Sequence, residues 1–159
     1  MSWPEQVERV SEALRAAAVE ARVEQFEDGT PTARDAARAV GAELAQIVKT
    51  IVLVCDGAFV LALVPGDRRA DERAVAEALG AGSVRSATPD EVREATGFEP
   101  GGVAPFPQRN VSVALIDRSL LAYDEVWIGA GTDRHLAALA PADLARLAGA
   151  RPFDLQHGG

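Results

Sequence analysis

Two long apolar runs joined by a two-residue turn constrain the fold of this chain more than any other feature. The runs cover residues 47–55 and 58–64, and the Asp56-Gly57 dipeptide between them is typical of tight β-hairpin turns. Neither run shows the apolar–polar alternation of a strand with one solvated face. The pattern therefore predicts a hairpin at the centre of a sheet, with both faces covered by other elements.

Helix caps and glycine stops predict the helices around this hairpin. Thr32 with Asp35 and Thr88 with Glu91 have the spacing of capping boxes, in which a hydroxyl and a carboxylate satisfy each other's backbone N–H groups. Glycine is the usual residue just past the end of a helix. The predicted helices open at Ser2-Pro4, Thr32, Asp71, Thr88 and Pro141, and those with a glycine stop end at Gly41, Gly80 and Gly97.

Short β-branched and apolar segments predict the remaining strands. They are residues 23–27, 84–86, 111–116 and 153–155, together with a second hairpin formed by 126–128 and 135–139. The segment 98–107 is too rich in Gly and Pro for regular structure. Hairpins and helices alternate without strict β-α-β order, so the predicted fold class is mixed α/β, or α+β: a largely antiparallel mixed sheet with helices packed around it.

Length and composition indicate one domain over residues 1–159, because no long Pro, Ser or Gly linker divides the chain. No apolar run approaches the ~20 residues that span a bilayer, so no membrane partner is expected. The N-terminus does not resemble a signal peptide, and the single cysteine, Cys55, fits a reducing compartment. A cytoplasmic location is therefore expected, with Cys55 buried and inert.

The net charge of −8 argues against a broad grip on a nucleic-acid backbone, although a small local contact is compatible with it. Arg68, Arg69 and Arg73 cluster after the first hairpin, where a solvated loop is the simpler interpretation. The two histidines, His135 and His157, do not form a metal-ligand cluster with the one cysteine. His157 lies in a polar, Gly-rich tail that is expected to fray.

Lys49 stands near the start of the first apolar run and is the single lysine of the chain. The other fifteen basic residues are arginine. The one position with lysine is a candidate for a site that needs a compact point charge and not a planar guanidinium. The pKa of a lysine also shifts readily when the side chain is buried. The alternative is a side chain that lays its stem on apolar surface and keeps its ammonium in water.

The loop Gly101-Gly102-Val103-Ala104-Pro105 is a second candidate site. Adjacent glycines let a ligand approach main-chain N–H groups closely, and the flanking prolines stiffen the segment. A rigid loop with backbone donors suits a carbonyl, carboxylate or phosphate. Its spacing matches neither the Walker loop nor the dinucleotide fingerprint, and a tight structural connection is the alternative.

Two further segments carry polar groups beside turns. In Thr30-Pro31-Thr32-Ala33, Thr32 is expected to cap a helix, whose N-terminus could still face an anion. In Gly129-Ala130-Gly131-Thr132-Asp133, the Thr or Asp could bind an amine or hydroxyl, or the segment could simply close a hairpin. No Gly-x-Ser-x-Gly elbow is present, and no pair of carboxylates is marked as an acid and base.

Five short segments occur in an order that is informative although none is specific alone. They are Thr30-Pro31-Thr32-Ala33, Gln46-Ile47-Val48-Lys49-Thr50, Val92-Arg93-Glu94-Ala95-Thr96-Gly97-Phe98, Gly101-Gly102-Val103-Ala104-Pro105 and Trp127-Ile128-Gly129-Ala130-Gly131. The set resembles the YbaK/ProX family of aminoacyl-tRNA deacylases, which are related to the editing domain of bacterial prolyl-tRNA synthetase. The order and approximate spacing agree over residues 10 to 155.

The resemblance implies a mixed α/β fold and a free-standing protein that hydrolyses mischarged aminoacyl-tRNA without a metal or an organic cofactor. It places the family's lysine at Lys49 and the family's Gly-Gly loop at Gly101 and Gly102. We expect these two glycine amides to hold the ester carbonyl, with Lys49 beside the terminal phosphate or the carbonyl. The resemblance further implies that the neighbouring ribose hydroxyl assists with the proton.

The expected partner is the acceptor end of an aminoacyl-tRNA carrying a small amino acid, with alanine first and Cys, Ser or Pro as further candidates. Arg68, Arg69 and Arg134 are candidates for the tRNA contact. The expected substrate-binding residues are Phe26, Thr30, Thr32, Thr50, Val103, Pro105, Gly131, Thr132 and Asp133.

Two departures from the family pattern bear on the substrate. Relatives often carry Arg where this chain has Pro31, and many have Gly-His where it has Phe106-Pro107-Gln108. Two other functions stay open: a module that binds an amino acid, nucleotide or adenylate without catalysis, and a partner of an aminoacyl-tRNA synthetase. The sequence leaves both a monomer and a homodimer open.

Overall fold

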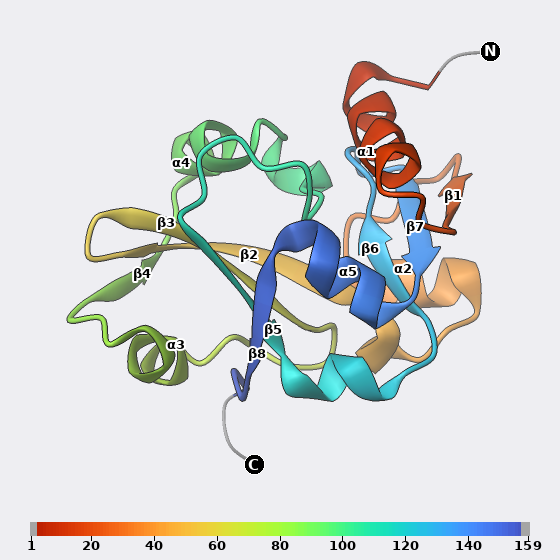
Figure 1. The fold of residues 1–159 in the computed structure, drawn as a ribbon. Helices are drawn as coiled ribbons and strands as arrows, with labels where there is room; N and C mark the ends of the chain where they lie inside the picture. Colours follow the sequence, from red (N-terminus) through yellow and green to blue (C-terminus); the bar gives the residue numbers. More distant parts are fainter. Residues whose placement is uncertain (1–2, 157–159) are drawn as a thin grey trace.

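The computed structural model describes residues 3–156, so the expectations for Ser2 and His157 lie outside the described residues. A five-stranded sheet forms the centre of the molecule, with strand order β4-β2-β3-β5-β8 (Figure 1). Its strands are β2 (Val48–Cys55), β3 (Ala58–Pro65), β4 (Val84–Ser86), β5 (Val113–Asp117) and β8 (Ala150–Phe153). The first predicted hairpin is confirmed as β2 and β3, which pair antiparallel along their full length.

The backbone geometry of the hairpin turn explains why Asp and Gly occupy its two positions. Asp56 and Gly57 both have positive φ, +48° and +83°, as tight hairpin turns with the right twist require. The Asp56 carboxylate also accepts hydrogen bonds from the Gly82 and Ser83 N–H groups, at 3.0 and 2.9 Å. Cys55 beside the turn is buried as expected, and burial raises the pKa of its thiol.

Helices cover both faces of the hairpin, which is why its strands lack polar alternation. Figure 1 shows α3 (Glu72–Leu79) and α4 (Pro89–Thr96) on opposite sides of it. Val75 of α3 packs with Leu53 and Val60, whereas Ala95 of α4 packs with Val52 and Leu61. α5 (Pro141–Ala148) and α1 (Glu5–Ala16) enclose the largest core cluster.

The strands divide between two sheets, where a single sheet was expected. The second sheet has the order β1-β7-β6, formed by β1 (Arg22–Gln25), β7 (His135–Leu139) and β6 (Val126–Gly129), and confirms the second hairpin. One bridge between Ile47 and Trp127 links the two sheets. Four of the six strand pairings are antiparallel, which confirms the mixed and largely antiparallel fold class.

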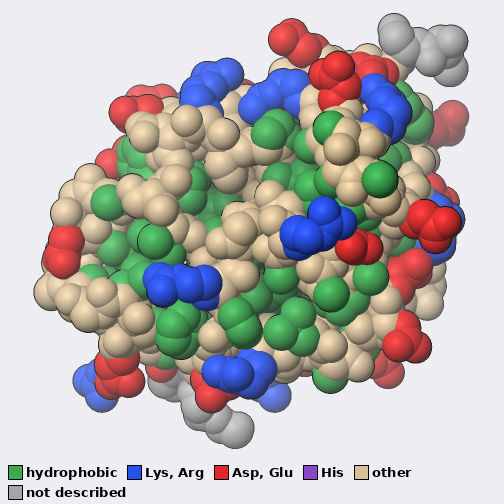
Figure 2. All heavy atoms as spheres, viewed as in Figure 1, with side chains coloured by type: hydrophobic (Ala, Val, Ile, Leu, Met, Phe, Trp, Pro, Cys, Tyr) green, Lys and Arg blue, Asp and Glu red, His purple; other side chains and the backbone are tan. Residues whose placement is uncertain are grey.

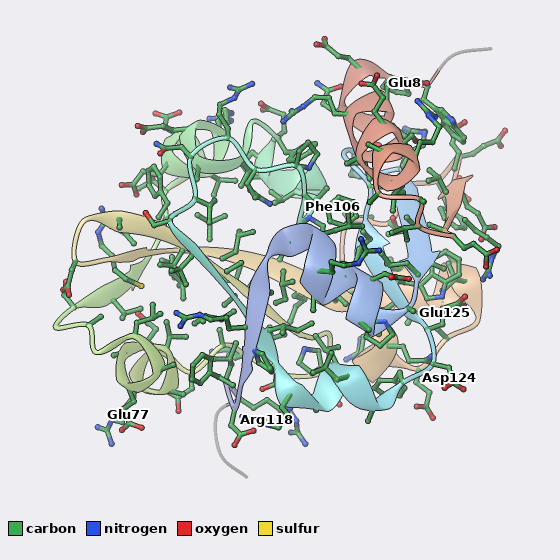
Figure 3. The ribbon with its side chains drawn as sticks, in the orientation of Figure 1. Glu8, Glu77, Phe106, Arg118, Asp124 and Glu125 are labelled. Carbon is green, nitrogen blue, oxygen red and sulfur yellow. The ribbon has the colours of Figure 1, made fainter. Side chains whose placement is uncertain are left out.

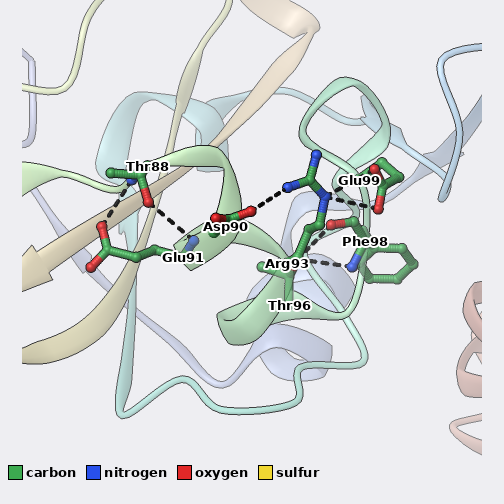
Figure 4. Close-up of polar contacts among 7 residues, drawn as sticks. All are labelled: Thr88, Asp90, Glu91, Arg93, Thr96, Phe98 and Glu99. Carbon is green, nitrogen blue, oxygen red and sulfur yellow. Dashed lines mark hydrogen bonds and ion pairs between the residues drawn. The ribbon is translucent and has the colours of Figure 1, made fainter.

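Both predicted threonine caps are confirmed, but the reciprocal capping box expected for Thr32 and Asp35 is half formed, because within residues 3–156 no hydrogen bond joins the Thr32 N–H to the Asp35 carboxylate. Thr32 accepts a hydrogen bond from the Asp35 N–H at 3.0 Å and opens α2 (Ala33–Val40). Thr88 and Glu91 form the reciprocal capping box of α4 (Figure 4). α2, α3 and α4 end at glycines in the left-handed conformation, Gly41, Gly80 and Gly97. Three short 3₁₀ helices among the described residues are η1 (Leu44–Gln46), η2 (Pro100–Gly102) and η3 (Arg118–Ala122).

Two local predictions are wrong. The segment 98–107 contains the one-turn η2, and the closing strand β8 begins three residues before the predicted 153–155 and ends at Phe153. Leu155 is instead held by buried Asp117, whose carboxylate accepts its N–H at 2.8 Å. Burial raises the pKa of Asp117, but hydrogen bonds from Ser119, Gln156 and Leu155 outweigh burial, so the pKa lies below its ordinary value. No helix within residues 3–156 is long and apolar enough to cross a bilayer.

Candidate functional site

A cavity of about 360 Å³ lies where the start of β2, the start of α2 and the Gly-Gly loop meet. Its lining combines apolar side chains with hydroxyls, backbone groups and one cation. The lining residues are Thr30, Pro31, Thr32, Ala33, Ala36, Ile47, Val48, Lys49, Thr50, Ile51, Pro100, Gly101, Val103, Gly129 and Leu136. Six of the twelve predicted site residues are among them, drawn from three separate segments.

Lys49 supplies the only charge among the described residues that line this cavity. Its side chain is half-buried on β2, and no ion pair within residues 3–156 engages it. Burial lowers the pKa of Lys49, and the charge of Arg69 lowers it further, against a smaller opposing effect of Asp67. The ammonium is therefore poorly compensated by the protein, and an anion or a carbonyl oxygen in the cavity would stabilise it.

Thr50 presents a second unpaired group on the same strand. Its Oγ1 atom is buried without a hydrogen-bond partner. β4 pairs with β2 only from Leu53 to Cys55, so the edge of β2 at Thr50 stays open beside the cavity. Since a buried hydroxyl without a partner is costly, this arrangement suits a ligand that supplies the missing hydrogen bond.

The two glycines of the loop have different surroundings. Gly101 lines the cavity, and a Cβ built on it would come no closer than 4.0 Å to another residue. Gly102 is buried, and a Cβ there would lie 2.5 Å from Cα of Thr132. Gly102 is thus required for close backbone packing against the turn between β6 and β7, whereas Gly101 faces the open space.

The Gly102 amide was expected to bind the ester carbonyl, but it is not available to a ligand. The Gly102 N–H donates to the Glu99 carbonyl at 2.8 Å, so it is already occupied. Within residues 3–156, no hydrogen bond engages the N–H of Gly101 or of Val103. The amides available to a ligand at this cavity are therefore those of Gly101 and Val103.

The threonines enter the cavity from the segment before α2. The Thr30 N–H donates to the Asp133 carbonyl at 2.6 Å, and its hydroxyl donates to the same oxygen at 3.3 Å. Thr32 caps α2 and also lines the cavity, so the cap and the ligand contact are compatible. Pro31 lines the cavity at the position of one family departure.

Five predicted substrate-binding residues do not line the cavity. Gly131 packs under α1, where a Cβ would lie 2.7 Å from the Gln6 carbonyl oxygen. Thr132 Oγ1 lies 2.6 Å from Nδ1 of buried His135, and Asp133 offers its carbonyl to Thr30. These three residues support the site from behind. Phe26 packs against the core cluster around Trp127, and Pro105 is buried.

Sequence reasoning missed the apolar wall of the cavity. Ala36, Ile47 and Leu136 come from α2, the start of β2 and β7, and each is buried. Their sequence pattern is that of ordinary core residues, so only the cavity itself identifies them. Phe106, the second departure from the family pattern, is 2% exposed in the main core and does not line the cavity (Figure 3).

The basic residues near the site are few. Arg69 lies close enough to Lys49 to affect its pKa, and Arg68 is exposed in the same segment. Arg134 is held by a short hydrogen bond to the Glu27 carbonyl. Figure 2 shows Lys and Arg as separate patches among acidic and apolar side chains, not as a continuous basic band on the face in view. Within the described range, no group of three His, Cys, Asp or Glu side chains could hold a metal ion.

Comparisons with known proteins agree on one family. The model of the aminoacyl-tRNA editing domain matches residues 27–147. The proline–tRNA ligase of Xanthomonas oryzae pv. oryzae is 34% identical over 137 residues, which are 84% of this chain and 24% of the ligase. The chain thus spans about a quarter of the length of such curated ligases. Protein YwhH of Bacillus subtilis is 31% identical over 77% of this chain and 78% of its own length.

A solved structure extends the similarity to the whole fold. The crystal structure of a candidate trans-editing enzyme for prolyl tRNA synthetase superposes with a TM-score of 0.90 at 40% identity. The match covers 99% of this chain and 100% of the other. The fold that the two chains share therefore includes the elements that frame the cavity, which are β2, β6, β7, the start of α2 and the Gly-Gly loop.

Proposed function

The chain belongs to the aminoacyl-tRNA editing domain family, and from this premise we propose that it is a free-standing deacylase that hydrolyses mischarged aminoacyl-tRNA. The observation that carries the proposal is the cavity that joins one desolvated cation, Lys49, to the free amides of a stiff Gly-Gly loop. An ester carbonyl develops negative charge when water attacks it, and these groups suit that charge.

The proposed reaction divides the work between the loop and Lys49. The Gly101 and Val103 amides hold the ester carbonyl oxygen, and one such donor contributes on the order of 10²–10³ in rate. This assignment replaces the Gly102 amide, which is occupied by Glu99. Lys49 pairs with the terminal phosphate or with the developing oxyanion. No carboxylate or histidine lines the described cavity, in keeping with a proton handled by the neighbouring ribose hydroxyl.

The proposed substrate carries a small amino acid, with alanine first. The wall formed by Ala36, Ile47 and Leu136 is apolar and buried, so it suits a small aliphatic side chain. Such a wall excludes bulk but separates neighbours that differ by one methylene only about 10–200-fold. Partial hydrolysis of Ser- or Cys-tRNA is therefore expected beside Ala-tRNA. Pro31 at the rim of the cavity is the departure that bears on this preference.

The proposed contact with tRNA is confined to its acceptor end. The protein carries a net charge of −8, Lys49 lines the cavity, and Arg69, which follows exposed Arg68, lies close enough to lower the pKa of Lys49. A contact with few phosphates gives weak, salt-sensitive binding. A synthetase that hands over the tRNA would compensate for weak binding. We propose a cytoplasmic location, where tRNA is charged and used.

A deacylation panel tests the proposal. Wild type and Lys49→Ala are incubated with tRNAs charged with Ala, Ser, Cys, Pro and Thr, and the matched control is Arg146→Ala on α5, away from the cavity. Hydrolysis of one or two of these by wild type and Arg146→Ala only is expected. If wild type hydrolyses none, the deacylase proposal is wrong. Thermal stabilisation by a nucleotide or amino acid would then favour a non-catalytic binding module.

A further inference from the structure

The N-terminal helix α1 contacts the segment that leads from α4 into the Gly-Gly loop and the turn between β6 and β7, although it lies outside residues 27–147 that match the editing-domain family. In Figure 1, α1 stands beside β6 and β7 and next to the loop that follows α4. We propose that α1 is a brace for the Gly-Gly loop, with Arg9 as its positioning residue. The proposal rests on the deacylase function proposed above only for its effect on rate.

The first connection runs through Arg9. Its guanidinium donates to the Gly97 carbonyl at 3.1 Å and to the Thr96 carbonyl at 3.5 Å. The guanidinium carbon also lies 4.5 Å from the centroid of the Phe98 ring. The Arg9 cation thus contacts two carbonyls at the C-terminal end of α4 and the face of one aromatic ring. The helix dipole favours the first contact, and the ring quadrupole favours the second. Arg9 therefore sets where the chain leaves α4 and enters the loop.

The second connection runs through the backbone of α1. The Gln6 carbonyl touches Gly131 so closely that a Cβ there would lie 2.7 Å from its oxygen. The next residue, Thr132, packs against Gly102 at the same kind of distance. Trp3 contacts His135 edge-to-face, with ring centroids 5.1 Å apart. α1 thus also supports the loop from behind, through the turn between β6 and β7.

The other hydrogen bonds of the loop are local in sequence: the Gln108 side chain donates to the Ala104 carbonyl at 3.3 Å, and the Gly102 N–H donates to Glu99. Arg93 pairs with Asp90 and Glu99 in Figure 4, but the side chains of Arg93 and Glu99 are 44% and 68% exposed. Exposed ion pairs of this kind stabilise by little. Within α4 itself, the Thr96 hydroxyl accepts the Phe98 N–H at 3.0 Å. Arg9 is half-buried and reaches across 88 residues of sequence, so its loss should loosen the loop more than loss of Arg93 would.

Two measurements on the full-length protein test the brace. The variants are Arg9→Ala, Arg9→Lys and the matched control Arg15→Ala, since Arg15 lies on the same helix with a side chain that is 66% exposed. Amide hydrogen exchange of Gly102 reports the loop directly, because its N–H is bonded to Glu99. In Arg9→Ala we expect this exchange to accelerate about tenfold, with β2 amides unchanged and Arg9→Lys intermediate.

Steady-state deacylation of Ala-tRNA supplies the second measurement. Misplacement of the loop amides should lower kcat about tenfold in Arg9→Ala and leave KM within about twofold, because the amino-acid wall comes from other segments. Equal exchange in Arg9→Ala and Arg15→Ala would overturn the brace. Faster exchange with unchanged kcat would overturn its role in the reaction. If wild type hydrolyses no aminoacyl-tRNA, the proposed function fails, and the exchange result still decides whether α1 holds the loop.

Discussion

Alanine substitutions at the two loop glycines should separate a packing requirement from a site requirement. Neither Gly101 nor Gly102 has a left-handed φ, so the added methyl group causes no backbone strain by itself. At Gly102 the new Cβ would lie 2.5, 2.8 and 2.9 Å from the Cα, C and N atoms of Thr132. These are backbone atoms, and they cannot move aside as the end of a flexible side chain can. The turn after β6 would have to shift.

The expected magnitude follows from this contact. Overpacking in a well-packed region costs about 1–3 kcal/mol. The loss of a glycine restricts the unfolded chain and offsets about 0.4–1 kcal/mol of that cost. A net loss of about 1–2 kcal/mol in the free energy of unfolding is expected for Gly102→Ala, or roughly 2–8 °C in Tm for a protein of this size. For Gly101→Ala, with its nearest neighbour at 4.0 Å, stability should be unchanged or slightly higher.

Urea denaturation of the two variants and wild type, followed by circular dichroism, measures the difference. The comparison is internal, because the two substitutions are identical and adjacent. Equal stability of Gly101→Ala and Gly102→Ala would show that the contact between Gly102 and Thr132 does not constrain the loop. A loss in Gly101→Ala larger than in Gly102→Ala would reverse the assignment of the two glycines.

Four further predictions concern charge. Lys49→Met should abolish most deacylation without lowering Tm, since the folded state desolvates this ammonium and lowers its pKa; a lower Tm would contradict this reasoning. The stability of wild type relative to Lys49→Met should rise as the pH increases from the lowered pKa of Lys49 toward 10.5, because the unfolded state then binds more protons at Lys49; urea titration of both proteins tests the sign and cancels the opposing effect of Cys55. Asp117→Asn should cost about 1–3 kcal/mol at pH 7, and the gap to wild type should close as the pH falls below 3.8 through the lowered pKa of Asp117, as denaturation at several pH values would show. If Lys49, Arg68 and Arg69 make the main phosphate contacts, the logarithm of tRNA affinity should fall with that of salt concentration with a slope of about −2 to −3, and a slope near −8 would point to a much larger surface.

The sequence predicted the elements of this fold well because their signals are local. The Asp56-Gly57 turn, the Thr88–Glu91 capping box and the glycine stops depend on residues a few positions apart. The division into two sheets was not predictable in this way. It depends on how the start of β2 meets β6, at the Ile47–Trp127 bridge, between residues 80 positions apart. The earlier end of β8 likewise depends on Asp117, which lies 38 residues before Leu155 on the neighbouring strand β5 and accepts its N–H.

The candidate site shows the same limit more sharply. Lys49 and the glycine pair were identified because one is unique in composition and the other is unusual in sequence. Nothing in the sequence distinguishes Ala36 or Leu136 from core residues, since the wall of a cavity and the interior of a domain use the same side chains. The prediction that Thr132 and Asp133 bind the substrate was wrong because polar residues in a turn can also serve packing. These residues support the loop from behind and do not line the cavity.

The position of Lys49 also bears on why this cation is not an arginine. No carboxylate lines the described cavity, and Asp67 offsets the desolvation of the ammonium only in part, so an anionic ligand would stabilise the charge further. A guanidinium at the same place would present a planar fork with five donors and would occupy space that a ligand needs. A slim stem with a compact charge leaves the cavity open beside Gly101. In a chain whose other fifteen cations are arginine, the exception lies at this cavity, where a compact charge and open space are combined.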